Sequence, residues 1–440
     1  LDGGEGRAVG HSRAARGANG RHRQNAYRRT ASARAGEHRD VDRLAHGGRQ
    51  LVADELRESD ALQAVEVLPE KDEKAVPQKK FDFTGKLFNA LLPVLGMLIA
   101  LLIGAIMLLF LNVNPLAAYA QLVNGAFGSI SGLTQTLVKA TPLLLVGLGI
   151  CIAFRASVIN IGGEGQIIVG ALAATWFPLA FRTWPGWILI PVTLMLGFLA
   201  GAVWGFVPGI LKARLKVNEI LTTVMMNAIA LQLMNLLIRS VLMDPAGITA
   251  GTYLAQSERL PEQAWLTRLV PQTLLHTGLL IAIALAFVVY IFLWRTTIGY
   301  RIRAVGFNAD AARFSGINVP FYQALSLTLA GGFAGIAGAI EVMGVQHRLL
   351  EGITSGYGFS GIVAALFGGL HPLGTIPASI LFGALLVGGD KMQRAVQVPN
   401  SLIMAILGLV VLFVVGSALW QRRWAARRLM AAAKNQEEQA

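Results

Sequence analysis

The sequence has few charged residues and a single cysteine. Only 14% of its 440 residues are Asp, Glu, Lys or Arg, whereas 54% are hydrophobic, a balance that excludes an ordinary soluble globular domain. Cys151 has no partner for an internal disulfide. The sequence also lacks a Gly-x-x-x-x-Gly-Lys-Ser/Thr phosphate loop, a Cys/His metal spacing and a Gly-x-Ser-x-Gly elbow. We therefore expect no enzyme activity, no metal and no cofactor.

Residues 1–80 differ in composition from the rest. The first 50 contain eleven arginines and no lysine, with almost no large aliphatic residues, which predicts disorder because no core can be buried. A targeting peptide would need an apolar stretch close behind the basic residues, and none appears before Leu87. A nucleic-acid-binding arm is an alternative. The run also resembles translation upstream of, or out of frame with, a true gene start. We expect residues 1–80 to be a charged cytoplasmic extension, 81–424 the membrane domain and 425–440 a cytoplasmic tail.

Ten apolar runs follow, and about 20 residues of helix are enough to cross the core of a bilayer. Three runs, 167–181, 361–370 and 376–388, are short, as expected of broken helices. The pattern predicts an all-α polytopic membrane protein of about ten transmembrane helices. The runs are residues 87–111, 133–154, 167–181, 187–211, 220–242, 274–294, 322–343, 361–370, 376–388 and 402–420.

Lys and Arg residues gather before the first run and after the fourth, sixth and tenth runs. Positive charge concentrates in cytoplasmic loops, and a count of ten places all four clusters on one side of the membrane. We therefore expect both termini in the cytoplasm and residues 243–272 outside.

A weak internal repeat links residues 165–172 with residues 360–367. Each segment opens an apolar run after a glycine-rich break. Most of the matching residues are small, and membrane helices favour small residues for close packing in any case. Two explanations of this match stay open: the chain consists of two weakly related halves, or the match arose by chance.

A polar, glycine-rich break interrupts the apolar sequence at residues 160–166. It offers Asn160, Glu164 and Gln166 together with three glycines. Backbone groups cannot stay unpaired in hydrocarbon, so an irregular segment at this depth is buried in protein or lines a wet cavity. The carboxylate of Glu164 favours a cavity, since ionisable groups in a membrane are costly. An ordinary interhelical turn capped by Asn160 or Glu164 is the alternative.

A second polar feature begins the fifth run. Glu219, Thr223 and Asn227 recur every four residues and therefore share one face of a helix. They predict either the lining of a passage or hydrogen bonds between helices, worth about 0.6 kcal/mol each. Glu341 in the seventh run is a third candidate for the passage.

A basic segment, residues 295–318, follows the sixth run. Asn308 is placed to cap a short helix over residues 309–315, which Gly316 is placed to end. Such a helix would offer a compact docking surface, whereas a solvated basic loop is the alternative. The candidate residues of this segment are Arg301, Arg303, Asn308, Asp310, Arg313 and Gly316.

Three of these features carry a family resemblance. Residues 154–166, the Asn-Glu-x-x-x-Thr-x-x-x-Asn pattern at 218–227 and residues 299–317 resemble the permease subunits of ATP-binding cassette (ABC) importers of nucleosides. The resemblance extends from about residue 81 to residue 424. It implies that residues 160–166 and 219–227 line a passage and that residues 301–316 contact an ATPase.

The resemblance also implies a location, the cytoplasmic membrane of a bacterium, together with partners and a substrate. Two permease chains, identical or different, would form a pore in the lipid, pair with cytoplasmic ATPase subunits that hydrolyse ATP, and receive solute from an extracytoplasmic binding lipoprotein. Nucleosides, purine nucleosides in particular, are the implied substrate, and no nucleic acid is expected to bind. Simple sugars are an alternative substrate. A stand-alone secondary transporter is an alternative mechanism, although Glu164, Glu219 and Glu341 form no obvious ion relay.

Overall fold

The computed structural model describes residues 83–245, 249, 251 and 254–399, together with separate positions between 401 and 416. The described helices belong to one compact unit, Phe83–Ala440. The expectations for residues 1–80 and 425–440 lie outside the described residues, as does much of the tenth apolar run.

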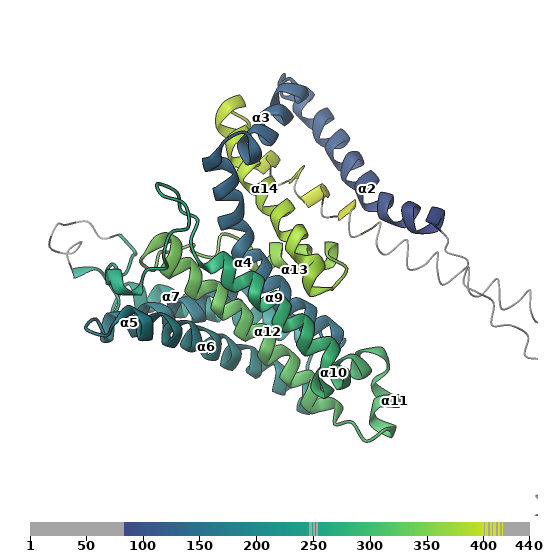
Figure 1. The fold of residues 1–440 in the computed structure, drawn as a ribbon, viewed down its shortest axis with the longest axis vertical. Helices are drawn as coiled ribbons and strands as arrows, with labels where there is room; N and C mark the ends of the chain where they lie inside the picture. The colour runs from purple at the N-terminus through teal and green to yellow at the C-terminus, as the bar shows by residue number, and fades with distance from the viewer. Residues whose placement is uncertain are drawn as a thin grey trace, which may run out of the picture. The chain divides into compact units, whose positions relative to one another are not determined.

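Helices make up all the named elements of the described part of the chain (Figure 1). Six of the described helices are long and apolar enough to cross a membrane: α4, α6, α7, α9, α12 with its π-helical extension, and α14. The predicted all-α polytopic membrane protein is thereby confirmed. The elements are α2 (Phe83–Phe110), α3 (Pro115–Phe127), α4 (Ile130–Arg155), α5 (Gly163–Ala180), α6 (Gly186–Leu215), α7 (Glu219–Ile238), the 3-10 turn η1 (Glu262–Ala264), α9 (Gly278–Arg295), α10 (Thr297–Phe307), α11 (Ala309–Phe314), α12 (Val319–Glu341), the π turn η2 (Val342–Gln346), α13 (Tyr357–Phe367) and α14 (Pro372–Val396).

Two helices differ from the apolar runs of the sequence. The 13-residue helix α3 was not predicted, because polar residues interrupt its apolar pattern; its start is fixed by Asn114, whose side chain accepts the backbone N–H of Leu116 at 3.0 Å. The expectation of a short run at 376–388 is wrong, since α14 has 25 residues. The helix packs along α3 and α4. This packing stabilises α14 beyond the end of its apolar run, where the polar residues Asp390 and Lys391 follow.

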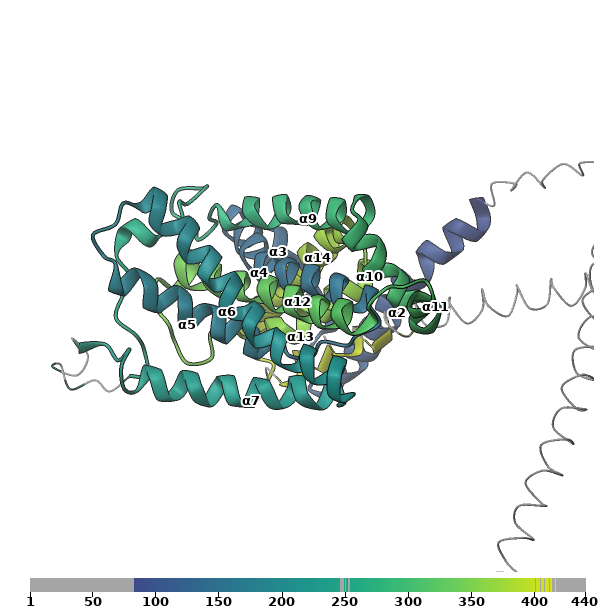
Figure 2. The same ribbon diagram turned by 90° about the horizontal axis from the view of Figure 1, so that it is seen from below.

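Glycines bring α6 and α12 into backbone contact, and the two helices lie side by side in Figure 1 and Figure 2. A Cβ on Gly201 would overlap the carbonyl oxygen of Gly331, and a Cβ on Gly335 would overlap that of Gly197. Gly205 meets the carbonyl oxygen of Leu327 in the same way. Small residues allow helices in a membrane to approach this closely. We call this contact the glycine seam.

One end of the bundle collects basic side chains. The end of α4 lies against α10, where the Ser157 hydroxyl donates to the carbonyl oxygen of Gly306 at 2.7 Å. Arg301 of α10 donates to the Tyr322 hydroxyl near the start of α12 at 2.9 Å. The end of α6 also lies beside the start of α12, through Gly209. We call this region the basic end, after Arg155, Lys212, Arg214, Arg295, Arg301, Arg303 and Arg313.

Candidate translocation site

Two short helices begin in the interior of the bundle, with their first turns in contact. A Cβ on Gly163, the first residue of α5, would lie 3.0 Å from the Cα of Gly358 in the first turn of α13. From this point α13 leads to the basic end, where the carbonyl oxygen of Leu370 accepts a hydrogen bond from Arg155 at 3.1 Å. The helix α5 leads away from that end, toward the start of α6. The two segments of the weak repeat, residues 165–172 and 360–367, lie within α5 and α13, and that they are related stays a prediction.

Glu164 lies at this meeting point. Its Oε1 accepts the backbone N–H groups of Gly358 at 2.7 Å and Phe359 at 3.4 Å, and the Thr354 side chain also hydrogen-bonds to it. The free N–H groups at a helix start carry a partial positive charge, so a carboxylate is stabilised there. Glu164 therefore belongs to the first turn of α5 and caps α13 as well. We call this arrangement the helix junction.

Asn160 and Gln166 support the loop that precedes α5. Both side chains are buried, and the Nδ2 of Asn160 donates to the Oε1 of Gln166 at 3.0 Å. The Oδ1 of Asn160 accepts the backbone N–H of Gly162 at 2.9 Å. These amides therefore satisfy polar groups of their own loop, as in the capped-turn alternative. That they contact a solute stays a prediction.

The polar stripe on α7 faces the same loop, as its spacing predicts. The Oδ1 of Asn227 accepts the backbone N–H of Gly165 at 2.8 Å, and its Nδ2 donates to the carbonyl oxygen of Ile161 at 2.9 Å. Thr223 is buried and donates to the carbonyl oxygen of Glu219 at 2.6 Å. Asn227 thus holds α7 to the start of α5. Whether the stripe also lines a passage stays a prediction.

Glu219, at the start of the stripe, makes an ion pair. Its carboxylate lies 2.7 Å from the Nζ of Lys212 at the end of α6. Asn218 caps the same helix start, since its side chain accepts the backbone N–H of Ile220 at 2.9 Å. The pair therefore closes the turn between α6 and α7 at the basic end.

Two residues at the helix junction were not predicted from the sequence. Lys139 of α4 donates to the hydroxyl of Tyr357, the first residue of α13, at 2.8 Å. Buried Glu341, at the end of α12, lies within electrostatic range of both. The signal for Lys139 was present, because it is a charged residue within the apolar run 133–154 and such residues usually mark functional sites. Tyr357 has no comparable signal.

The predicted short helix after Asn308 is confirmed. The Asn308 side chain accepts the backbone N–H groups of Asp310 and Ala311, both at 3.0 Å. The helix α11 ends at Phe314, one residue earlier than expected, and Gly316 adopts the left-handed conformation with φ +77°. Asp310 and Arg313 are exposed, and Phe314 is 94% exposed. The segment is therefore a capped helix that exposes an aromatic ring, whereas the alternative considered was a solvated basic loop without a helix.

Arg301 and Arg303 of the same segment point to different partners. Arg301 reaches Tyr322, as described above. Arg303 stacks on the Trp294 ring, with 5.6 Å between the guanidinium carbon and the ring centroid. Arg303 is therefore not part of the exposed surface of α11.

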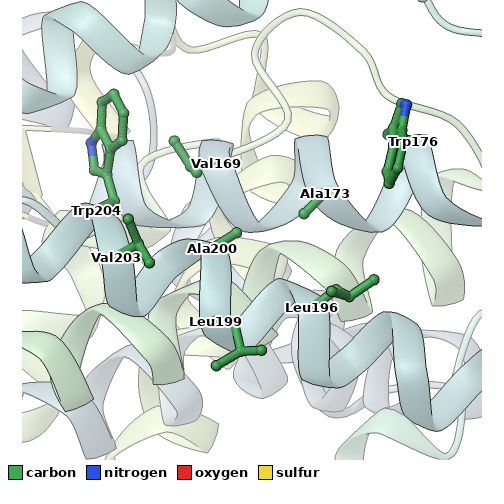
Figure 3. Close-up of a pocket in the computed structure, with 8 residues that line it drawn as sticks. All are labelled: Val169, Ala173, Trp176, Leu196, Leu199, Ala200, Val203 and Trp204. Atoms are coloured by element: carbon green, nitrogen blue, oxygen red, sulfur yellow. The ribbon is translucent and has the colours of Figure 1, made fainter.

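An apolar groove between α5 and α6 lies apart from these polar groups (Figure 3). Its volume is about 350 Å³. Trp176 and Trp204 stand toward its two ends in Figure 3, and the indole N–H of Trp204 donates to the carbonyl oxygen of Met226 at 3.3 Å. The lining residues are Val169, Ala173, Trp176, Leu196, Leu199, Ala200, Val203 and Trp204. Apart from the indole N–H of Trp176, these walls offer no free hydrogen-bonding side chain to a polar solute.

A bundle of membrane helices with polar groups gathered at interior helix starts is typical of a transport protein. The comparison with known families specifies the class. Residues 132–415 match the family described as the branched-chain amino acid transport system / permease component. The chain belongs to this family of permease components, which confirms the resemblance seen in the sequence.

Three relatives are similar over most of their length. The guanosine ABC transporter permease protein NupP of Bacillus subtilis is 36% identical, over 76% of this chain and 94% of that protein. The nucleoside ABC transporter permease protein NupB of Lactococcus lactis subsp. cremoris is 32% identical, over 74% and 90%. The glucose ABC transporter permease protein TsgB13 of Haloferax volcanii is 34% identical, over 75% and 88%. No solved structure matches this chain significantly.

Proposed function

We propose that this chain is the permease subunit of an ABC importer and carries nucleosides, purine nucleosides in particular, across a bacterial cytoplasmic membrane. The helix junction is the observation that carries the proposal. Two helix starts and the Glu164 carboxylate meet inside the bundle, where a solute with hydroxyl groups and ring nitrogens finds donors and acceptors. The names of NupP and NupB, which specify guanosine and nucleosides, support this substrate class.

The proposed assembly contains subunits beyond this chain. A second permease chain, identical or different, completes the pore, and a binding lipoprotein delivers solute at the end opposite the basic end. The basic end faces the cytoplasm, since positive charge concentrates there, and both termini lie on that side. Separate ATPase subunits hydrolyse ATP and dock on α11, where Asp310, Arg313 and Phe314 are exposed.

The contacts of α10 provide a route from the ATPase to the helix junction. Gly306 packs directly on the end of α4, and Arg301 joins α10 to the start of α12. A displacement of α11 is therefore passed to α4 and α12. These two helices carry Lys139 and Glu341, which lie beside the start of α13. ATP-driven closure of the ATPases would thereby alter access to the junction.

Uptake by proteoliposomes tests the proposal. The permease is reconstituted with its ATPase subunits and binding lipoprotein, and labelled guanosine is supplied with ATP. We expect ATP-dependent uptake that unlabelled adenosine competes and glucose does not. Uptake driven by an ion gradient without any ATPase subunit would contradict the importer and favour a secondary transporter.

Simple sugars are a second candidate substrate, because TsgB13, at 34% identity, is named as a glucose permease. The same proteoliposomes distinguish the two classes. Glucose uptake that excess guanosine leaves unchanged would assign the chain to sugars and retain the ABC mechanism.

Reversing one charge on α11 tests the docking surface. Arg313→Glu places a negative charge on an exposed position, so we expect it to abolish ATP-dependent uptake while the protein still inserts into the membrane. Arg214→Glu makes the same charge change at another exposed position of the basic end and should retain most uptake. Normal uptake by Arg313→Glu would show that α11 is not the contact.

A further inference from the structure

A polar pocket of about 330 Å³ lies at the basic end. It is formed by the end of α4, the end of α10 and the turn between α13 and α14. Its wall contains two arginines and neither Asp nor Glu, so it is a positively charged cavity without a carboxylate in its lining. The lining residues are Phe154, Arg155, Ser157, Arg303, Gly306, Phe307 and Leu370.

The pocket is held open by contacts between segments that are distant in the sequence. A Cβ on Gly306 would overlap the carbonyl oxygen of Arg155, so α10 rests directly on the end of α4. The Ser157 hydroxyl donates to the carbonyl oxygen of Gly306 at 2.7 Å, and Arg155 donates to that of Leu370 at 3.1 Å. The cavity is therefore preformed, as binding sites for small groups usually are.

Arg303 has a donor without an acceptor. Its guanidinium lies over the Trp294 ring at 5.6 Å, and that of Arg155 lies over the same ring at 5.1 Å. The Nε–H of Arg303 is buried and has no hydrogen-bond partner among the described residues. A buried donor on a charged group is costly when it is unpaired. An anion bound beside the guanidinium would offset this cost through its charge.

The surroundings of the pocket are suited to a lipid. Phe307 at its rim is 83% exposed. The face of α9 that leads toward Trp294 exposes Phe287, Val288 and Ile291. Tyr290 and Trp294 stack on each other at 5.5 Å near the end of α9, and such aromatic residues mark the boundary between membrane and water. A charged cavity thus adjoins an apolar surface where acyl chains can lie.

We propose that Arg155 and Arg303 bind the phosphate of an anionic phospholipid, with its acyl chains along the exposed face of α9. Guanidinium groups match the oxygens of a phosphate in bidentate fashion. Basic pockets between membrane helices on the cytoplasmic side bind such head groups. The bound lipid connects α4, α10 and the α13–α14 turn, the segments that link α11 to the helix junction. Arg303 is then a lipid ligand rather than an ATPase contact.

Lipid binding to the purified full-length chain tests this proposal without any transport assay, so its result is independent of the importer's substrate. The chain in neutral detergent is titrated with phosphatidylglycerol, phosphatidylcholine or inorganic phosphate. Native mass spectrometry reports retained lipid, and the unfolding midpoint reports stabilisation. We expect phosphatidylglycerol to be retained and to raise the midpoint to a plateau, with a much smaller effect of phosphatidylcholine.

Two variants locate the site. Arg303→Gln should weaken phosphatidylglycerol binding at least about tenfold, the loss expected for a hydrogen bond to a charged group. Arg214→Gln removes an exposed charge at the same end and should bind as the unmodified chain does. Unchanged binding by Arg303→Gln would overturn the proposal.

The unmodified chain provides a further test, which remains available if Arg303→Gln does not fold. Equal retention of the two lipids would overturn the proposal. Stabilisation by inorganic phosphate, with no advantage of phosphatidylglycerol over phosphatidylcholine, would show that the anion is free phosphate and that the lipid assignment is wrong.

Discussion

The glycine seam and the helix junction both depend on glycine, but they use the close approach of two helices differently. In the seam, Gly201 and Gly331 bring two long helices into backbone contact with no polar side chain between them. At the junction, Gly163 and Gly358 bring two helix starts together beside the Glu164 carboxylate. The seam is a close-packed contact between backbones, whereas the junction gathers helix-start N–H groups that polar side chains accept. The same residue type therefore serves two purposes in this bundle: it packs two long helices together in the seam, and it brings polar groups together at the junction.

The largest effect is expected in the seam. Gly331→Val introduces a side chain where even a Cβ would overlap the carbonyl oxygen of Gly201, so α6 and α12 must separate. Overpacking typically costs about 1–3 kcal/mol, and we expect more here because backbone, and not a flexible side chain, blocks the added group. We expect the variant to accumulate poorly and to unfold at a lower temperature in detergent.

Gly408→Ala is the matched control, since nothing lies within 4 Å of a Cβ added there. Alanine favours a helix over glycine by up to about 1 kcal/mol, so this variant should be at least as stable as the unmodified chain. Similar expression and unfolding temperatures for the two variants would contradict a seam that depends on backbone contact.

The next largest effect is expected where α7 holds the junction. Asn227→Leu leaves the backbone N–H of Gly165 and the carbonyl oxygen of Ile161 without their partner. Each unpaired group costs about 1–3 kcal/mol. We therefore expect a lower unfolding temperature together with a loss of uptake.

Gln232→Leu, on the exposed surface of the same helix, is the control and should change neither property. If Asn227→Leu unfolds at the temperature of the control, Asn227 does not hold the loop in place.

A smaller effect on stability is expected at the Glu164 carboxylate, and it separates function from structure. Glu164→Gln keeps an oxygen that can accept the N–H of Gly358 but removes the charge. We expect the unfolding free energy to fall by only about 1 kcal/mol and uptake to fall about tenfold or more. The two quantities are measured by thermal unfolding and by proteoliposome transport. If the variant instead loses much stability, and its uptake falls only as far as the amount of folded protein falls, the role of Glu164 at the junction is purely structural.

The smallest expected effect on stability comes from the titration of His276. Its ring is packed against glycines, as the helices of the seam are. A Cβ on Gly278 or on Gly344 would lie 2.6 Å from this ring. Burial and, to a smaller extent, the nearby His347 lower the pKa of His276 from its usual value to about 4. Arg259 and Arg268, which face His347, lower the pKa of His347 in addition to its burial.

Acidification should therefore destabilise the folded protein. Between pH 6.5 and pH 4 the unfolded chain binds a proton at His276 and the folded chain does not. We expect the unfolding free energy to fall by about 1 kcal/mol from pH 7 to pH 5.5. His276→Gln should flatten this dependence, measured as the unfolding temperature across that range. An equal slope in the variant would show that other groups titrate.

Local signals allowed much of the site to be predicted. The cap at Asn308 and the left-handed turn at Gly316 depend on neighbouring residues only, and both are confirmed. The shared face of Glu219, Thr223 and Asn227 follows from the helical period in the same way. The polar break at 160–166 was recognised as an interruption between two apolar runs, and α5 begins within it.

Contacts between distant segments could not be predicted. Nothing near Tyr357 in the sequence indicates that Lys139, 218 residues away, donates to it. The stacking of Arg303 on Trp294 was missed for the same reason, and Arg303 was assigned to the docking surface. The length of α14 was underestimated because packing on α3 and α4 extends the helix beyond its apolar run.

The sequence by itself determined that the chain is a membrane bundle, where its helices break and which family it belongs to, because hydropathy, caps and motifs act over a few neighbouring residues. Only the tertiary structure decided that α5 and α13 meet start to start, that Glu164 serves both helices and that two arginines share one pocket. The physical reason is that helices in lipid associate through close packing and hydrogen bonds between side chains and backbone. Those contacts depend on which faces meet, and the pattern of a single helix does not contain that information.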